Sequence, residues 1–390
     1  MKTMLVDKYM IRKQNESVVL AQIIKYGTIS RAEVAKLTGL NKATVSEITA
    51  SLIEKELVEE LGEGSGTKKG GRKPVLMGFN QQAGYTLNFD LGYNYVSSSL
   101  TYLDGSFVDT KKIKNFEVNR DNVMEILADI INDHRAKCQA SSTYGLVGIT
   151  IAIHGIVEDN RIVFTPYYNL DQLDIVAELG KLYDIPVIVE NEANLTAVAE
   201  ATFSSRDAEI VSLSIYSGIG AGVIINEQLH KGKAGKSGEV GHSTLYPNGR
   251  PCPCGNQGCL EQYCSEKAVL EAFSQETGLK AELNVLISEY REDNPVALQL
   301  IDEMAFHLSI GVNNLICHFS PETIFLNSAI IRKIPEILSL IKSHLSSSFN
   351  QEVALVNSKL GANATLYGAA AISIRRFLEL KSLDLTVKES

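Results

Sequence analysis

The sequence has 390 residues, 45 % hydrophobic and 21 % charged, so it can form two or three globular domains with separate cores. No apolar run approaches the roughly 18 residues of a membrane span. The N-terminus lacks a charged leader followed by an apolar segment, and we therefore expect a cytoplasmic protein. The net charge of −9 argues against non-specific nucleic-acid binding by the chain as a whole.

Charge is distributed unevenly along the chain. Residues 1–80 carry 13 Lys and Arg against 9 Asp and Glu, whereas the remaining residues carry 24 against 37. A small basic module joined to a large acidic body indicates that two different partners are bound separately.

Three helices are predicted in the basic module. Apolar residues recur at helical spacing over 15–26, which predicts a first helix ending before Gly27. Ser30-Arg31-Ala32-Glu33 has the form of a capping box, and the helix that it begins should end near Gly39. Asn41 can cap a third, amphipathic helix with a polar N-terminal end. The second and third of these helices are joined by a short link and therefore form a helix-turn-helix. Its later helix could enter a major groove.

A basic wing is predicted to follow. Residues 57–61 and 75–79 have the pattern of two strands, joined by a Gly-rich basic segment that contains Arg72. This segment could reach into a narrow A·T-rich minor groove, or it could be only a solvated linker. The predicted DNA contacts are Ser30, Arg31, Lys42, Ala43, Thr44, Ser46, Glu47, Lys68, Lys69, Gly71, Arg72 and Lys73.

The acidic body has the pattern of a duplicated α/β fold. Strands at 85–91 and 95–103 form a predicted hairpin, and strands at 211–215 and up to Ile225 repeat it around the glycine-rich segment 217–222. Such glycine-rich turns can bring backbone N–H groups close to phosphate. Each half continues with alternating strands and helices, so we predict domains at 1–80, 81–200 and 201–390.

A polar cluster follows the predicted strand at 187–190. Glu190, Asn191 and Glu192 lie at its carboxyl end, the edge at which open α/β sheets bind ligands. Carboxylates and an amide there can form paired hydrogen bonds with adjacent hydroxyls, as a sugar site requires. The alternative is that Asn191 only caps the next helix while Glu192 complements the helix dipole.

A histidine and three cysteines lie within 18 residues, at His242, Cys252, Cys254 and Cys259. Thiolates and an imidazole can satisfy a tetrahedral zinc ion together, so we predict one structural zinc site in each chain. The alternatives are unrelated reduced thiols or a disulfide. The ion would fix Glu239, His242 and Glu261 around a cavity.

These motifs, with Leu360-Gly361-Ala362-Asn363, resemble the ROK family of repressors and sugar kinases over nearly the whole chain, and most of all its xylose-repressor branch in Gram-positive bacteria. The resemblance implies a winged helix-turn-helix followed by a two-lobed actin-like and hexokinase-like ATPase fold. The implied zinc ligands are His242, Cys252, Cys254 and Cys259. The implied sugar site comprises Gly155, Asn191, Glu192, Glu239, His242 and Glu261.

Departures from the family pattern favour a repressor over an enzyme. Kinases of this type carry Asp-x-Gly-Gly-Thr, where this chain has Asp90-Leu91-Gly92-Tyr93-Asn94. Glu192 replaces the catalytic Asp, and one added methylene can cost on the order of 100-fold in rate.

We predict a repressor of carbohydrate-utilisation genes that binds a palindromic operator as a homodimer or a pair of homodimers. A monosaccharide or short saccharide would modulate its DNA affinity; which sugar acts, and in which direction, is left open. The alternatives are a sugar kinase with an attached DNA-binding module and a constitutive DNA-binding protein with a vestigial effector domain.

Overall fold

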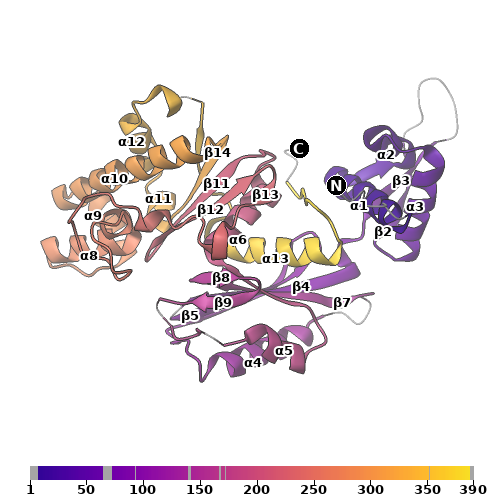
Figure 1. Ribbon diagram of the computed structural model, residues 1–390, viewed down its shortest axis with the longest axis horizontal. Helices are drawn as coiled ribbons and strands as arrows, with labels where there is room; N and C mark the ends of the chain where they lie inside the picture. Colours follow the sequence, from indigo (N-terminus) through magenta and orange to yellow (C-terminus); the bar gives the residue numbers. More distant parts are fainter. Residues whose placement is uncertain are drawn as a thin grey trace, which may run out of the picture. The chain divides into compact units, whose positions relative to one another are not determined.

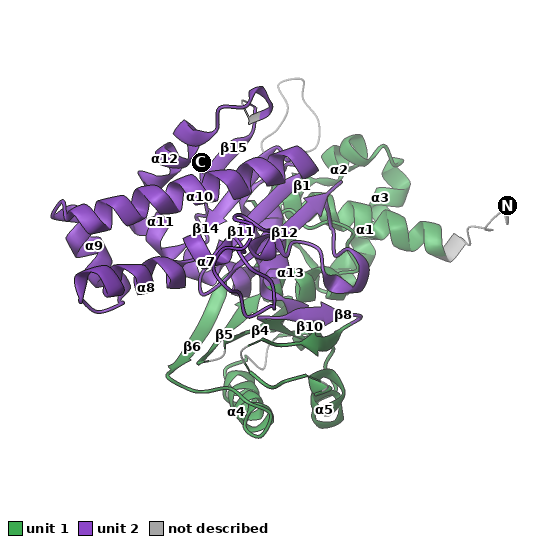
Figure 2. Ribbon diagram, turned by 60° about the vertical axis from the view of Figure 1, so that its left-hand side comes forward, with its two compact units in different colours: residues 1–153, 160–189, 369–390 green, residues 154–159, 190–368 purple. Residues whose placement is uncertain are grey.

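A computed structural model describes residues 8–64, 73–92, 94–138, 142–166, 168–171, 173–350 and 352–386. Two compact units are formed, one from residues 1–153, 160–189 and 369–390 and the other from residues 154–159 and 190–368 (Figure 2). Within the described ranges, no helix is both long and apolar enough to cross a membrane.

The N-terminal module of the first unit is a winged helix (Figure 1). Its elements are α1 Lys8–Tyr26, β1 Thr28–Ser30, α2 Arg31–Thr38, α3 Lys42–Glu54, β2 Val58–Glu63 and β3 Val75–Phe79, with the strands in the order β1-β3-β2. The predicted caps are confirmed. Ser30 and Glu33 form the capping box, Gly39 ends α2 in the left-handed conformation, and Asn41 accepts a hydrogen bond from the backbone of Thr44.

Two features of this module differ from the sequence-based prediction. Helix α1 begins at Lys8, earlier than the predicted start near residue 15, because its first turns are polar and give no apolar periodicity. Strand β1 was not predicted, since three residues are too few for an alternating pattern. The long wing segment 65–72, with Lys68, Lys69, Gly71 and Arg72, lies outside the described residues.

The sheet of the first unit has the strand order β10-β7-β4-β5-β6. Its strands are β4 Gly84–Gly92, β5 Tyr95–Tyr102, β6 Phe107–Lys114, β7 Gly145–Ile153 and β10 Val187–Asn191. Strands β4, β5 and β6 are antiparallel neighbours, and β7 runs parallel to β4. Helices α4 Val123–Arg135 and α5 Ile175–Leu182 lie on one face (Figure 1).

The second unit repeats this topology. Its sheet has the order β13-β12-β11-β14-β15, with β11 Ile210–Ile215, β12 Ile219–Ile225, β13 Gln228–Leu229, β14 Thr323–Asn327 and β15 Ala354–Asn357. An antiparallel run of β11, β12 and β13 is again extended on the other side of its first strand by parallel β14. The predicted duplication of an α/β unit is thereby confirmed.

Helices complete the second unit, whose buried apolar residues form one large cluster around α10. They are α6 Glu192–Ala199, α7 Glu261–Cys264, α8 Glu266–Thr277, α9 Leu283–Arg291, α10 Pro295–Phe319, α11 Ala329–Lys333 and α12 Ile337–His344. A π-helical turn, Glu200–Ser204, extends α6. Strands β8 Ile156–Glu158 and β9 Arg161–Phe164 are short, and helix α13 Ala364–Phe377 begins in the second unit and ends in the first.

Candidate functional site

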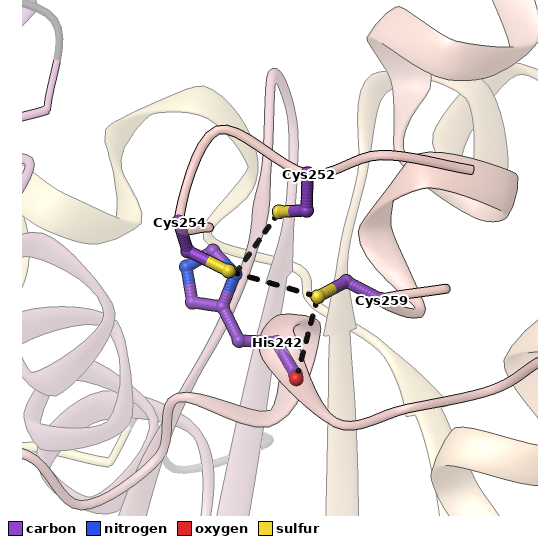
Figure 3. Close-up of side chains that lie close together, drawn as sticks. All are labelled: His242, Cys252, Cys254 and Cys259. Carbon is purple, nitrogen blue, oxygen red and sulfur yellow. Dashed lines mark hydrogen bonds between the residues drawn. The ribbon is translucent and has the colours of Figure 1, made fainter. Parts of the chain in front are cut away.

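The four predicted metal ligands lie together in the second unit. The nitrogen and sulfur ligand atoms of His242, Cys252, Cys254 and Cys259 all lie within 4.8 Å of one another. Figure 3 shows the three sulfurs and the imidazole turned toward one point. Backbone bridges between Thr244 and Cys259, and between Pro251 and Gln257, close the loop that carries them.

The spacing of the ligand atoms fits a small ion with tetrahedral coordination. The Sγ atoms of Cys254 and Cys259 are 3.7 Å apart, and Sγ of Cys252 is 3.6 Å from Nδ1 of His242. Metal–ligand bonds of about 2.0–2.3 Å in a tetrahedron place neighbouring ligand atoms roughly 3.3–3.8 Å apart. The cluster can therefore bind a metal ion, and Nδ1 is the His242 nitrogen that lies close to Sγ of Cys252.

Two carboxylates flank the imidazole of His242 on opposite sides. Glu261 is buried, with Oε1 3.5 Å from Nδ1 and 3.3 Å from Sγ of Cys252, so it belongs to the surroundings of the metal cluster. Glu239 lies on the other side, 3.9 Å from Nε2. Partial burial raises the pKa of Glu239; His242 opposes that rise and Glu261 adds to it. Glu239 thus lies near Nε2, whereas Glu261 and Cys252 lie near Nδ1.

Glycines fix the turn 238–242 against strand β12. A Cβ atom on Gly238 would lie 1.7 Å from the carbonyl oxygen of Ala221, and one on Gly241 would lie 2.1 Å from that of Ile219. Only glycine allows so close a backbone approach. The turn that presents Glu239 and His242 is consequently placed by the sheet itself, and not only by the metal cluster.

Strand β12 also contacts helix α6. A Cβ atom on Gly222 would lie 2.3 Å from the carbonyl oxygen of Ala193. A Cβ atom on Gly220 would lie 3.2 Å from the Cβ of Ala193 and 3.9 Å from Oε1 of Glu192. The sequence pattern predicted a glycine-rich turn over 217–222, but Gly220 and Gly222 lie inside the strand. Close helix packing requires glycine at position 222 and leaves little space at position 220.

Asn191 both caps α6 and contacts the second polar segment. Its Oδ1 accepts a hydrogen bond from the backbone of Asn194 at 3.0 Å, and its Nδ2 donates to the carbonyl oxygen of Gly155 at 2.9 Å. The capping interpretation of Asn191 is thus confirmed, although one amide hydrogen and one lone pair are not used by these bonds. Beside it, Nδ1 of His154 is 3.9 Å from Oε1 of Glu192.

Buried Glu190 holds this group in place and was not predicted to do so. Its Oε1 accepts hydrogen bonds from the backbone N–H of Asn191 at 2.9 Å and from Nδ2 of Asn194 at 3.0 Å. Its Oε2 forms an ion pair with Lys231, at the start of the loop that leads to Glu239. No sequence motif marks Lys231, because the pairing joins segments far apart in the chain.

The structure therefore brings the predicted sugar-site residues into two groups within the second unit. Gly155, Asn191 and Glu192 form one group, and Glu239, His242 and Glu261 form the other. Strand β12 connects them, since it contacts α6 through Gly220 and the 238–242 turn through Ile219.

The first glycine turn, in the other unit, is filled by aromatic side chains. The ring of Tyr95 lies so close to Gly92 that a Cβ there would be 2.1 Å from it. The Tyr95 hydroxyl donates to Asp90 at 2.9 Å, and the Tyr168 hydroxyl donates to the carbonyl of Leu91 at 2.7 Å. The carboxylate and backbone of this turn are thus engaged by protein groups.

The predicted DNA contacts fall into three sets. Lys42, Ala43, Ser46 and Glu47 are exposed on α3, with Thr44 partly exposed, and Lys73 lies at the end of the wing, 3.8 Å from Glu63. Ser30 and Arg31 have structural partners instead. The Ser30 side chain is buried and bonded to Glu33, while Arg31 bonds to Thr49 and Glu60. Lys68, Lys69, Gly71 and Arg72 lie outside the described residues.

The fold and site define a class of protein in which a winged helix precedes a duplicated α/β body that carries a His/Cys cluster in its second half. The sequence model of the ROK family matches residues 86–376. The chain belongs to this family.

Individual relatives extend the match to nearly the whole chain. The chain is 37 % identical to the xylose repressor of Bacillus subtilis (strain 168) over 382 residues, which cover 96 % of this chain and 98 % of that protein. It is 34 % identical to the xylose repressor of Staphylococcus xylosus, with 97 % and 99 % covered. Both relatives are therefore matched over the N-terminal module as well as the body.

Solved structures show the same architecture. A ROK family transcriptional regulator, described as a homolog of the E. coli MLC protein, superposes with a TM-score of 0.80 at 27 % identity, covering 94 % of this chain and 96 % of that one. A ROK family glucokinase from Streptomyces griseus superposes with a TM-score of 0.64 at 22 % identity, covering 74 % and 98 %, and shows the fold alone.

Proposed function

We propose that this chain is a sugar-responsive transcriptional repressor of carbohydrate-utilisation genes, in which sugar binding at the second unit changes the affinity of the winged helix for an operator. The observation that carries the proposal is the combination, in one chain, of a winged helix with a group of amide, carboxylate and imidazole side chains that could bind hydroxyls. Relatives named as repressors, matched over nearly their whole length, support it.

The proposed metal is a structural zinc ion held by His242, Cys252, Cys254 and Cys259. Three thiolates and one imidazole are the ligands of closed zinc sites, which stabilise a fold and leave no open position for substrate. The cluster orients His242 so that Nε2 faces Glu239, and this nitrogen can bond a hydroxyl group.

The proposed effector is a monosaccharide or short saccharide, and xylose is the first candidate because close relatives are named for it. Asn191, Glu192, Glu239 and His242 offer donors and acceptors for adjacent hydroxyls, with Glu261 and the Gly155 backbone supporting them. A site built of such groups discriminates strongly against ligands that lack a hydroxyl, because its polar atoms are then left unpaired.

For DNA, we propose that a homodimer places α3 of each copy in the major groove of one half-site of a palindrome. The exposed N-terminal part of α3 carries Lys42, Ala43, Ser46 and Glu47, where a recognition helix contacts base edges. The Lys- and Arg-rich wing would contact the flanking minor groove or backbone. Because operator DNA lies in the bacterial cytoplasm, we propose that the chain acts there.

We propose further that the chain has no kinase activity. Tyr95 covers Gly92 and bonds Asp90, which removes the open backbone that a phosphate-binding turn requires. Glu192 carries one methylene more than the Asp of the kinases, and a displacement of about 1 Å can cost on the order of 100-fold in rate.

A thermal-shift screen of purified full-length protein tests this function. Monosaccharides and disaccharides, D-xylose among them, are added with and without ATP. A sugar at 100 times its dissociation constant should add about 2.7 kcal/mol of stability, and ATP should add nothing. Formation of a phosphorylated sugar in a coupled assay, or absence of any stabilising sugar, would overturn the proposal.

A further inference from the structure

The C-terminal segment of the chain helps to build the core of the winged helix. One buried apolar cluster contains Leu20 and Ile23 of α1 together with Ile374, Leu380 and Leu383 of the C-terminus. Each of these side chains is at least nine-tenths buried. The fold of the DNA-binding module is thus completed by residues that lie at the opposite end of the sequence.

Polar contacts fix the same segment to α1. Lys13 forms an ion pair with Glu379 at 2.6 Å, and Lys25 forms one with Asp384 at 3.1 Å. The hydroxyl of Ser17 donates to the carbonyl oxygen of Glu379 at 3.3 Å. Contacts distributed over the length of α1 set the orientation of this helix relative to the C-terminal segment.

The other end of helix α13 contacts the helix that starts at the sugar site. A Cβ atom on Gly368 would lie only 1.9 Å from the carbonyl oxygen of Leu195 in α6, and the rings of Tyr367 and Phe203 are 5.0 Å apart. Helix α6 begins at Glu192, directly after Asn191. A displacement of α6 by a ligand at its first turn must therefore be followed by α13 or must break this contact.

We propose that α13 and the C-terminal segment 378–386 transmit the state of the sugar site to the winged helix, with Gly368 as the contact at one end and the α1 cluster at the other. The proposal rests on the function proposed above. Helix α13 is continuous from Ala364 to Phe377, although its residues belong to both units. A rigid helix can carry a small shift over its length because its turns cannot deform independently.

Operator affinity with and without sugar measures the coupling. The full chain is titrated with a selected operator fragment in the absence and presence of the sugar that stabilises it most in the panel above, D-xylose included. The ratio of the two dissociation constants for the native sequence should lie in the range of about 5 to 150 that is usual for allosteric proteins.

Gly368→Ala should reduce this ratio at least fivefold, because the added methyl group forces α13 away from Leu195. Gly180→Ala is the matched control. Gly180 also lies within a helix, but a Cβ there meets nothing within 4 Å, and the ratio should be unchanged. An unchanged ratio in the Gly368 variant would overturn the proposal.

Leu383→Ala tests the contact between the C-terminal segment and α1. This variant tests the proposal if the Gly368 variant does not fold. Loss of this buried side chain should reduce the ratio to the same degree, whereas Ser382→Ala, at an exposed neighbour, should leave it unchanged.

Hydrogen exchange of the native chain provides a readout that needs no variant. Sugar should alter protection in α1 and in residues 378–386 together with α6, and a change confined to α6 contradicts the proposal. If the native chain binds DNA identically with and without sugar, the function proposed above fails instead.

Discussion

At the scale of single residues, Glu190 shows how one buried charge can position a binding group. Its carboxylate holds the backbone of Asn191 and the amide of Asn194, and Lys231 supplies the compensating charge. Buried carboxylates are stable only when paired or hydrogen-bonded. The ion pair thus connects the start of α6 to the loop before Glu239.

Lys231→Met should weaken both folding and sugar binding. Removing one partner of a buried pair costs 3–5 kcal/mol in general, and we expect about 1–2 kcal/mol here because Lys231 is half exposed. Denaturant unfolding and calorimetric sugar titration measure the two effects. Lys233→Met, at an exposed lysine of the same loop, should change neither quantity. Equal behaviour of the two variants would show that the ion pair has no positioning role.

We expect His134 to make the stability of the first unit depend on pH. The residue is fully buried, with Nε2 3.0 Å from the Ser98 hydroxyl and Nδ1 3.1 Å from Asp109. Burial lowers the pKa of His134, and Asp109 only partly opposes this shift. The charged groups that face it are Asp109, Asp133, Lys111 and Lys137.

Because the folded-state pKa of His134 lies below its ordinary value of 6.5, the unfolded chain binds the proton more readily. The stabilising contribution of the neutral imidazole is complete above about pH 6.5 and is lost as the pH falls through the lowered pKa. Urea unfolding at a series of pH values from about 7.5 down to about 5 should therefore show falling stability. His134→Gln should flatten the slope, and an unchanged slope would assign it to other groups.

At the scale of elements, local signals predicted the caps of α2 and α3 and the bounds of β3. The caps could be predicted because Ser30 and Asn41 each bond a partner within the first turn of their own helix. The metal cluster could also be predicted from the sequence, because its four ligands lie in one short segment. The glycines of β12 were expected to form a turn, because a sequence does not reveal that α6 packs on that strand.

The metal loop should stabilise the second unit and the sugar site together. Cys254→Ser removes one of four ligands and should lower both the thermal midpoint and the sugar affinity, as should treatment with a strong chelator. Cys317→Ser is the matched control, because Cys317 is also exposed and lies outside the cluster. If sugar affinity survives full metal removal, the cluster does not organise the site.

Helix α3 should determine which bases are read. Lys42→Ala should change sequence preference within the half-site by about 1–3 kcal/mol at the contacted position, because a base contact is lost. Competition binding against a panel of single-base operator variants measures this change. Lys359→Ala, at an exposed lysine of the second unit, should have no effect. Equal loss on all sequences would reduce Lys42 to a phosphate contact.

At the scale of the whole molecule, the sequence pattern predicted a winged helix followed by two similar α/β halves, and the strand orders confirm the duplication. It did not predict that residues 369–390 join the first unit, or that Leu383 lies in the core of the winged helix. Such contacts join opposite ends of the chain, and neither periodicity nor capping signals carry information about them. Lys231 and His134 were missed because their partners, Glu190 and Asp109, are too distant in sequence to form a local motif with them.

The central claim is that sugar bound in the second unit alters DNA binding by the first. Its most direct test is the dissociation constant of the zinc-loaded full chain for its operator, measured at fixed salt with and without saturating sugar. We expect a change of at least about fivefold, the lower end of typical allosteric coupling. An operator affinity that is identical in the two conditions would contradict the account.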